Sequence, residues 1–288
     1  MQFVYKVPGY ILCLLAGFCL SLGGPLIRAF EGASPWQILF WRSIFFVLAI
    51  SIFLFLTYKK EAINIIVKSG FAGIFGGLFL STSFLGYVFA ITETTIANVV
   101  FIISSQTLFL AIFGYFFLKE KISLRSFMAI IMAISGVILM VGDSISGGSL
   151  TGNLAALLIP INFSILIIII RKNPHLDMMP AIFYAGILSA IYGFILSENL
   201  IISYKDLGLS FLLGVPQLAF GFIFVTIGSK KTSAAAVGLF MLTESIFGPI
   251  WGWLIFNEIP PTSVFIAGSM IIMAVFIKGF EKTKPATV

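Results

Sequence analysis

Apolar stretches of about twenty residues follow one another along nearly the whole chain. Short segments with charges or turn-forming residues separate them, such as Glu31-Gly32, Lys59-Lys60-Glu61 and Pro260-Pro261. A helix needs about 20 mostly apolar residues to cross the hydrocarbon layer of a bilayer. The pattern therefore predicts ten membrane-spanning helices, at residues 8–27, 34–56, 68–90, 95–117, 123–141, 150–170, 178–196, 207–227, 233–256 and 262–280.

Composition points the same way. Hydrophobic residues make up 60% of the 288 residues and charged residues only 10%, whereas a soluble domain has about 25% charged residues. The first apolar stretch is not followed by a small-residue cleavage site, so we interpret it as a retained span and not as a signal peptide. Cys13 and Cys19 form neither a disulfide nor a metal-binding pattern.

The basic residues lie on alternate connecting segments. With the N-terminus inside, fourteen of the 17 Lys and Arg residues fall in inside segments; Arg28 and Lys205 alone lie in outer loops, and Arg42 lies within a span. Because basic residues favour the cytoplasmic side, we expect a multi-pass protein of a bacterial inner membrane with both termini in the cytoplasm. Insertion then explains the net charge of +6, and we expect no nucleic-acid partner.

The sequence repeats itself at an offset of 138 residues. Between Thr94–Leu139 and Thr232–Ile277, 12 of 46 positions are identical, against about four expected by chance from so biased a composition. One copy therefore holds five spans, and an odd number inverts the second copy in the membrane. We predict repeats at 1–142 and 150–288, joined by a periplasmic linker at 143–149. Inverted repeats are typical of alternating-access carriers.

Two related segments carry a family resemblance. They run from Thr94-Thr95-Ile96-Ala97-Asn98-Val99 to Phe117-Leu118-Lys119-Glu120-Lys121-Ile122-Ser123, and from Thr232-Ser233-Ala234-Ala235-Ala236-Val237 to Ile255-Phe256-Asn257-Glu258. Each segment has small residues, then an apolar stretch and an aliphatic run, and then a Glu that closes the helix. This order resembles the EamA-type repeat of the drug/metabolite transporter superfamily. Thr243-Glu244 with Gly248-Pro249-Ile250-Trp251-Gly252-Trp253 resembles its ninth-helix signature, and Arg42 also matches a family position.

The resemblance implies an all-α integral membrane fold: ten transmembrane helices as two inverted five-helix repeats around a central cavity. Spans five and ten would lie at the periphery, where members of the family often form a homodimer. The chain departs from the family at two positions. Thr107 and Ser245 stand where relatives often have Pro after the Gln of the fourth helix and the Glu of the ninth. Without those prolines, we expect gating there to rely on Gly.

Two ionisable residues lie inside predicted spans, where a charge costs about 2.5–3.5 kcal/mol on the insertion scale. Glu244 is near the middle of span nine, and Arg42 is about two turns inside the outer end of span two. As substrate contacts, Arg42 would bind a carboxylate or phosphate, and Glu244 an amine or a proton. As structural residues, they would pair with each other or with backbone carbonyls.

Neutral polar and aromatic residues extend this set of candidate substrate contacts. Gln106 occupies the repeat position equivalent to Glu244, which suits a central site. The alternative is hydrogen bonding between helices, worth roughly 0.6 kcal/mol each, or an interfacial aromatic belt for the tryptophans. The further candidates are Asn98, Asn162, Gln217, Trp41 and Tyr87.

These observations predict a secondary transporter that moves a small polar or amphipathic metabolite, such as an amino acid, amine or nucleotide-like compound, across the inner membrane by alternating access. The chain shows no nucleotide-binding Gly-rich loop, metal cluster or nucleophile arrangement, so we expect no enzyme activity, metal or cofactor. The partners are a small-molecule substrate and the bilayer. The alternatives are a channel or scaffold without carrier activity, or a membrane-embedded enzyme.

Overall fold

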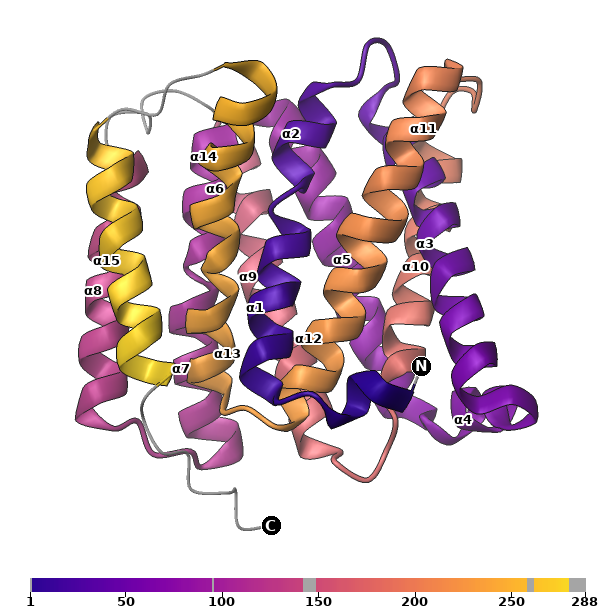
Figure 1. The fold of residues 1–288 in the computed structure, drawn as a ribbon. Helices are drawn as coiled ribbons and strands as arrows, with labels where there is room; N and C mark the ends of the chain where they lie inside the picture. The colour runs from indigo at the N-terminus through magenta and orange to yellow at the C-terminus, as the bar shows by residue number, and fades with distance from the viewer. Residues whose placement is uncertain (1, 95, 142–148, 258–261, 280–288) are drawn as a thin grey trace.

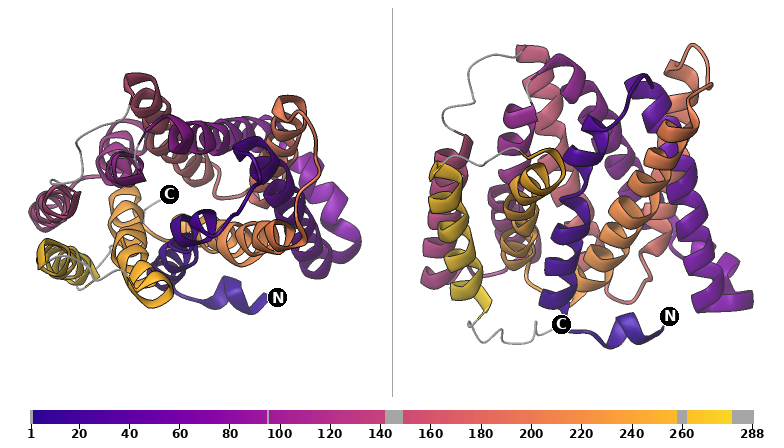
Figure 2. Two further views of the ribbon diagram at one scale, coloured as in Figure 1. Left: turned by 90° about the horizontal axis from the view of Figure 1, so that it is seen from above. Right: turned by 45° about the horizontal axis from the view of Figure 1, so that its top comes forward.

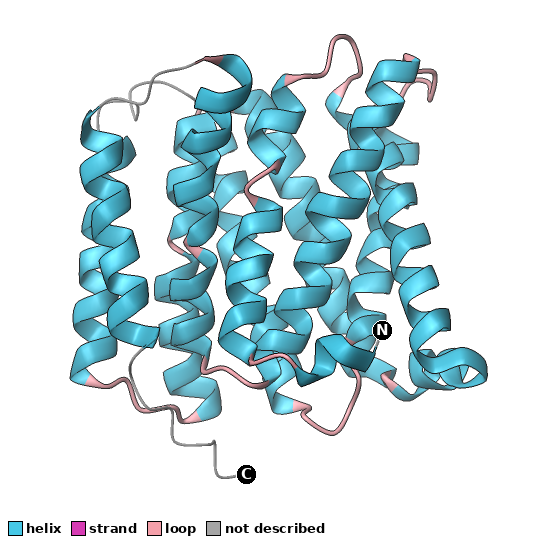
Figure 3. Cartoon of the chain, viewed as in Figure 1, coloured by secondary structure: helices cyan, strands magenta, loops and turns pink. Residues whose placement is uncertain are grey.

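A computed structural model describes residues 2–94, 96–141, 149–257 and 262–279. Within these ranges the secondary structure is entirely helical (Figures 1 and 3). In chain order the elements are η1 (Gln2–Lys6), α1 (Gly9–Leu20), α2 (Gly23–Arg28), α3 (Pro35–Tyr58), η2 (Lys59–Glu61), α4 (Ala62–Lys68), α5 (Gly70–Glu93), α6 (Ile96–Ser104), α7 (Gln106–Leu118), α8 (Leu124–Val141), α9 (Leu150–Lys172), α10 (Met179–Leu196), α11 (Tyr204–Leu212), η4 (Leu213–Ala219), α12 (Phe220–Lys230), α13 (Ala234–Met241), α14 (Thr243–Phe256) and α15 (Thr262–Gly279).

Eight helical segments among the described residues are long and apolar enough to cross a membrane. Two shorter apolar helices, Leu124–Leu139 and Phe265–Lys278, fall in the predicted fifth and tenth spans. The predicted helix positions agree with the structure to within a few residues; for example, the span predicted at 34–56 is α3, Pro35–Tyr58. Residues 143–148, which make up most of the predicted linker, lie outside the described residues.

The helices form a bundle with one pair set apart at an edge. α8 and α15 lie side by side there (Figures 1 and 2). Small and aliphatic side chains bury this pair against α6 and α13, including Ala129, Ala133, Ala267 and Ala274. The larger core lies in the rest of the bundle, where rings of Phe46, Phe84, Phe163 and Phe222 pack edge to face.

Glycines four residues apart occur at Gly73 with Gly77 and at Gly248 with Gly252, a spacing that lets helices touch. A Cβ added at Gly77 on α5 would lie 2.6 Å from Cβ of Tyr184 and 2.8 Å from the Ala181 carbonyl oxygen on α10, so this glycine allows the two backbones to approach. Gly248, in the other four-residue glycine pattern, has open space at the same position. Of Gly77 and Gly248, Gly77 is therefore the one that makes a packing contact.

Polar contacts join the connecting segments at each end of the bundle. At one end, which we call the basic end (residues 2–7, 58–61, 119–123, 171–178 and 229–234), Lys231 donates to the Val7 carbonyl at 3.1 Å and Lys230 donates to the Leu176 carbonyl. At the opposite end the Asp206 carboxylate accepts from the backbone N–H groups of Glu31 and Ala33, both at 3.1 Å. Segments predicted to share a side of the membrane therefore do meet.

Candidate functional site

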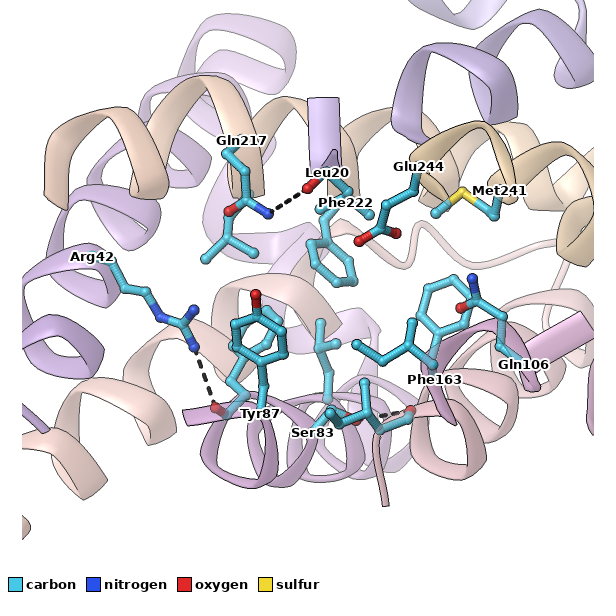
Figure 4. Close-up of a pocket in the computed structure, with 15 residues that line it drawn as sticks. Leu20, Arg42, Ser83, Tyr87, Gln106, Phe163, Gln217, Phe222, Met241 and Glu244 are labelled. Carbon is cyan, nitrogen blue, oxygen red and sulfur yellow. Dashed lines mark hydrogen bonds between the residues drawn. The ribbon is translucent and has the colours of Figure 1, made fainter. Parts of the chain in front are cut away.

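A cavity lined by both polar and apolar side chains lies inside the bundle, between helices of both predicted halves (Figure 4). Its volume, counted as space for the centre of a water molecule, is about 80 Å³. Since one water needs about 10–15 Å³ on this measure, the cavity has room for a few waters. Its lining residues are Leu20, Arg42, Leu80, Ser83, Phe84, Tyr87, Ile103, Gln106, Ile159, Phe163, Gln217, Leu218, Phe222, Met241 and Glu244.

Helix interruptions place most of the polar lining residues. Figure 3 shows short loops halfway along several helical columns. Leu20 ends α1, Gln106 begins α7, and Glu244 is in the first turn of α14. Interrupted helices with half-helix ends at mid-membrane are a usual way for carriers to build a binding site, because they expose backbone groups and dipole ends.

The interruptions in the fourth and ninth predicted spans form without proline or glycine. α6 and α7 meet at Ser105 (ψ −11°), and α13 and α14 meet at Leu242 (ψ −7°). Backbone bonds of the i to i−3 type tighten both junctions, from Ser105 to Ile102 and from Leu242 to Leu239. Such a turn ends one helix and starts the next. The two junctions agree within one residue under the 138-residue repeat, although both spans were predicted to be continuous.

The two residues that replace the family prolines bond across the repeats. The Thr107 hydroxyl on α7 donates to the Gly238 carbonyl on α13 at 3.2 Å. The Ser245 hydroxyl on α14 lies 3.2 Å from the Ser104 hydroxyl on α6. Each hydroxyl therefore ties one interrupted helix to the other. Hydrogen-bonded hydroxyls occupy these places in this conformation, and the dependence of gating on glycine stays a prediction.

The eighth predicted span is distorted by Pro216. Between α11 and α12 the helix widens into the seven-residue π-turn η4. Proline has no N–H to donate and its ring clashes with the preceding turn, which gives a physical cause for the widening. Gln217 follows directly and reaches the cavity, where its Nε2 donates to the Leu20 carbonyl at 3.3 Å. Its Oε1 is buried and has no hydrogen-bond partner.

Arg42 projects from α3 into one end of the cavity (Figure 4). The residue is 2% exposed, and its Nη2 donates to the Phe84 carbonyl at 3.2 Å. Its Cζ lies 5.5 Å from the ring centre of Phe84 and 5.7 Å from that of Tyr87, which is within range for cation–π attraction. Nε is buried without a partner, and Arg42 forms no ion pair with another described residue.

Glu244 lies at the other end of the cavity. Its carboxylate points inward, near Met241 and across from Gln106 (Figure 4). Glu244 lies in the first turn of α14, where the helix dipole is positive. Among the described residues Glu244 makes neither an ion pair nor a side-chain hydrogen bond. The arrangement can hold a cation or a proton.

Five of the predicted site residues therefore meet at the cavity: Arg42, Tyr87, Gln106, Gln217 and Glu244. Three others lie elsewhere. Asn98 donates to Asn153 Oδ1 on α9 at 3.3 Å, Asn162 donates to Thr82 Oγ1 at 2.9 Å, and Trp41 Nε1 donates to the Leu200 carbonyl at 2.9 Å. These three side chains connect helices or loops in this conformation.

The sequence reasoning missed the apolar part of the cavity. Phe84, Phe163 and Phe222 are among the residues that line it. With 32 phenylalanines in the chain, no sequence signal distinguishes these three from lipid-facing ones. The described residues contain no group of three or more His, Cys, Asp or Glu side chains that would hold a metal ion.

Comparison with known proteins identifies the kind of protein. The exporter of pseudopaline from Pseudomonas aeruginosa is 24% identical over 279 residues, covering 92% of this chain and 94% of the relative. Human solute carrier family 35 member G1 is 25% identical over 291 residues, covering 92% and 77%. An uncharacterised transporter of Methanothermobacter thermautotrophicus is 26% identical over 200 residues, which is 64% of this chain and 57% of the relative.

A solved crystal structure shares the fold. It superposes with a TM-score of 0.77 at 17% identity, over 94% of this chain and 96% of the other. The apolar helical bundle and its relatives define a multi-pass membrane transporter. The model of the EamA-like transporter family matches residues 7–142 and 150–279. The chain belongs to this family, as the resemblance of its repeats predicted, and its relatives are drug/metabolite transporters.

Proposed function

We propose that the chain is a secondary carrier that moves a small polar or amphipathic metabolite across a bacterial inner membrane by alternating access. Its ten helices would form two inverted five-helix halves, 1–142 and 150–288, with both termini in the cytoplasm. The observation that carries the proposal is the cavity, because opposite charges from the two halves, Arg42 and Glu244, line it without pairing.

The size of the cavity favours a carrier over an open channel. Space for a few waters does not admit a metabolite until helices move, and the interrupted helices at Ser105 and Leu242 supply paired places for such movement. Repeat-related junctions suit an exchange of conformations between the halves. The hydroxyls of Thr107 and Ser245 would hold the junctions together in this conformation.

A reconstitution experiment tests the carrier. Purified protein is screened by thermal shift against amino acids, amines, nucleosides and nucleotides, and each compound that raises the melting temperature is tested for counterflow in liposomes. A carrier gives saturable uptake that increases when unlabelled compound is present inside. Uptake that rises linearly with the outside concentration and does not change when unlabelled compound is present inside would indicate a channel and overturn the proposal.

Topology is tested separately with reporter fusions. Fusions after Lys60 and Lys231 should report the cytoplasm, and a fusion after Thr94 should report the periplasm, because basic residues gather on the inner side. A periplasmic signal after Lys60 or Lys231 would contradict the proposed orientation.

A further inference from the structure

The cavity has two oppositely charged ends, and neither Arg42 nor Glu244 forms an ion pair with another described residue. Resting on the proposed carrier function, we infer that the substrate is dipolar: a carboxylate binds at Arg42, and a cationic amine on the same molecule binds at Glu244. This names a substrate class that the family membership leaves open.

The Arg42 end is built for a carboxylate. The guanidinium packs against the rings of Phe84 and Tyr87, and the single bond from Nη2 to the Phe84 carbonyl fixes its orientation. Nε remains buried and unpartnered, and Arg42 is 2% exposed. Arginine presents donors in a planar fork that matches the two oxygens of a carboxylate. A ligand carboxylate would therefore supply the missing acceptor.

Gln217 adds an acceptor at the same end. Its Nε2 is engaged by the Leu20 carbonyl, which leaves Oε1 buried without a partner. A Cβ added at Gly23 would lie 3.2 Å from Gln217 Nε2 and 3.6 Å from the Tyr87 hydroxyl, so these two side chains lie next to each other. A donor beside the ligand carboxylate, such as an α-ammonium group, would satisfy Oε1.

The Glu244 end offers the opposite charge. Its carboxylate points into the cavity from the first turn of α14, opposite Gln106 (Figure 4), and no described cationic side chain pairs with it. A ligand amine would donate to it. Hydrocarbon between the two ends would lie against Phe84, Phe163 and Phe222. The lining thus matches a molecule with charged ends and an apolar middle.

The cost of removing charges from water favours one dipolar ligand over a simple amine or a simple carboxylic acid. An unpaired charge in a dry interior is costly, and removing one partner of a pair leaves that cost in full. A simple amine would leave Arg42 unpaired, and a simple carboxylic acid would leave Glu244 unpaired. A molecule with both groups pairs both residues at once, so it should bind more tightly than either analogue.

The test uses matched probes with purified protein in detergent and in liposomes. The dipolar probes are ω-aminoalkanoates of graded chain length and lysine. Each ω-aminoalkanoate is compared with the alkanoate and the alkylamine of the same length, and lysine with cadaverine, which lacks the carboxylate. At the best length we expect the dipolar probe to bind about tenfold more tightly than both analogues and to show counterflow. Lysine should exceed 6-aminohexanoate if Gln217 accepts from an α-ammonium group.

Charge-neutral variants assign each end. Glu244→Gln should abolish the preference for an ω-aminoalkanoate over its alkanoate, and Arg42→Gln should abolish the preference over its alkylamine. Arg42→Lys keeps the charge and should keep the preference for a carboxylate, which provides a second measurement if Arg42→Gln does not fold. Glu31→Gln and Arg125→Gln remove matched charges from exposed positions and should leave both preferences unchanged.

Two outcomes overturn the inference. In the first, no probe binds, or monopolar probes bind as tightly as dipolar ones. In the second, Glu244→Gln lowers flux of every probe equally without altering the preference between them, which would make Glu244 a proton site. The proposed carrier function survives either outcome if another screened metabolite shows counterflow, and it fails separately if none does.

Discussion

Arg42, which is buried, and Arg171, which is mostly buried, have opposite surroundings in this transporter. At the basic end Arg171 donates from Nη1 to the Ser229 carbonyl at 2.7 Å and to the Thr232 carbonyl, and its Nη2 pairs with Glu120. Glu120 also accepts from the Ala234 N–H at 2.9 Å, at the start of α13. In the cavity Arg42 has one hydrogen bond and no ion pair among the described residues.

This difference makes Arg171 a structural charge, whereas Arg42 is a charge available to a ligand. Glu120 accepts from the backbone N–H of Ala234 at the start of α13 and pairs with Arg171, and both partners lie in the other predicted half. That cluster therefore fastens the halves at the basic end. Arg42 and Glu244 form no ion pair with each other, so the sequence-based alternative of an Arg42–Glu244 bridge does not describe this conformation.

The largest stability effect is expected at the basic end. Arg171→Ala should lower the free energy of unfolding by about 3 kcal/mol, since it leaves Glu120, whose side chain is only 20% exposed, without its partner. The melting temperature in detergent measures this. Arg171→Met combined with Glu120→Leu should recover part of the loss. Lys205→Ala, which breaks an exposed pair with Glu31, should change stability by less than about 1 kcal/mol.

Substitution of the charged residues in the cavity should lower flux and leave stability near wild type. Arg42→Ala and Glu244→Ala should each lower flux at least tenfold, equivalent to about 1.4 kcal/mol in the transport barrier, while the melting temperature stays near wild type because no buried partner is left unpaired. Flux and melting temperature are measured for both single variants and the double variant. Recovery of stability and flux in the double variant would show that Arg42 and Glu244 bridge the halves, and it would contradict this comparison.

The hydroxyls at the interrupted helices should have a smaller effect. Thr107→Val removes the bond to the Gly238 carbonyl and keeps the shape of the side chain, so it should cost about 1 kcal/mol of stability. Ser245→Ala should lower stability by no more than about 1 kcal/mol, since it removes only the hydrogen bond to the Ser104 hydroxyl. Thermal melting measures both. A loss several times larger would show that the junctions depend on these bonds and not on their backbone turns.

The smallest effect is expected at the N-terminal segment. Tyr5 donates to Asp177 at 3.2 Å and lies 2.5 Å from the Tyr58 hydroxyl. Burial, and then the Asp177 charge, raise the pKa of Tyr5 above its ordinary value. Tyr5→Phe should cost about 0.5–1 kcal/mol.

The raised pKa sets the pH dependence of that loss. The hydrogen bonds of Tyr5 are fully present below the unfolded pKa of about 10 and are lost only as the pH rises through the higher folded value. The stability difference between wild type and Tyr5→Phe should therefore be constant from about pH 6 to pH 9. A difference that shrinks as the pH falls across this range would contradict the assigned partners.

The sequence alone determined the membrane class, the positions of the helices, the family and the internal repeat. These features depend on local composition: a run of apolar residues must be a helix in lipid because no water satisfies its backbone. It also singled out Arg42 and Glu244, since charge within an apolar run is costly wherever the helix packs. The equivalence of Gln106 and Glu244 followed from the repeat offset.

Only the tertiary structure decided which polar residues share a cavity. Asn98, Asn162 and Trp41 have the same sequence signal as Gln106 and Gln217, a polar or amphipathic side chain in an apolar run, but they bond to neighbouring helices or loops instead. Side-chain direction depends on helix rotation and on interruptions at Ser105 and Leu242, which no proline or glycine marks. Packing between segments far apart in the chain sets both, so the local sequence does not encode them.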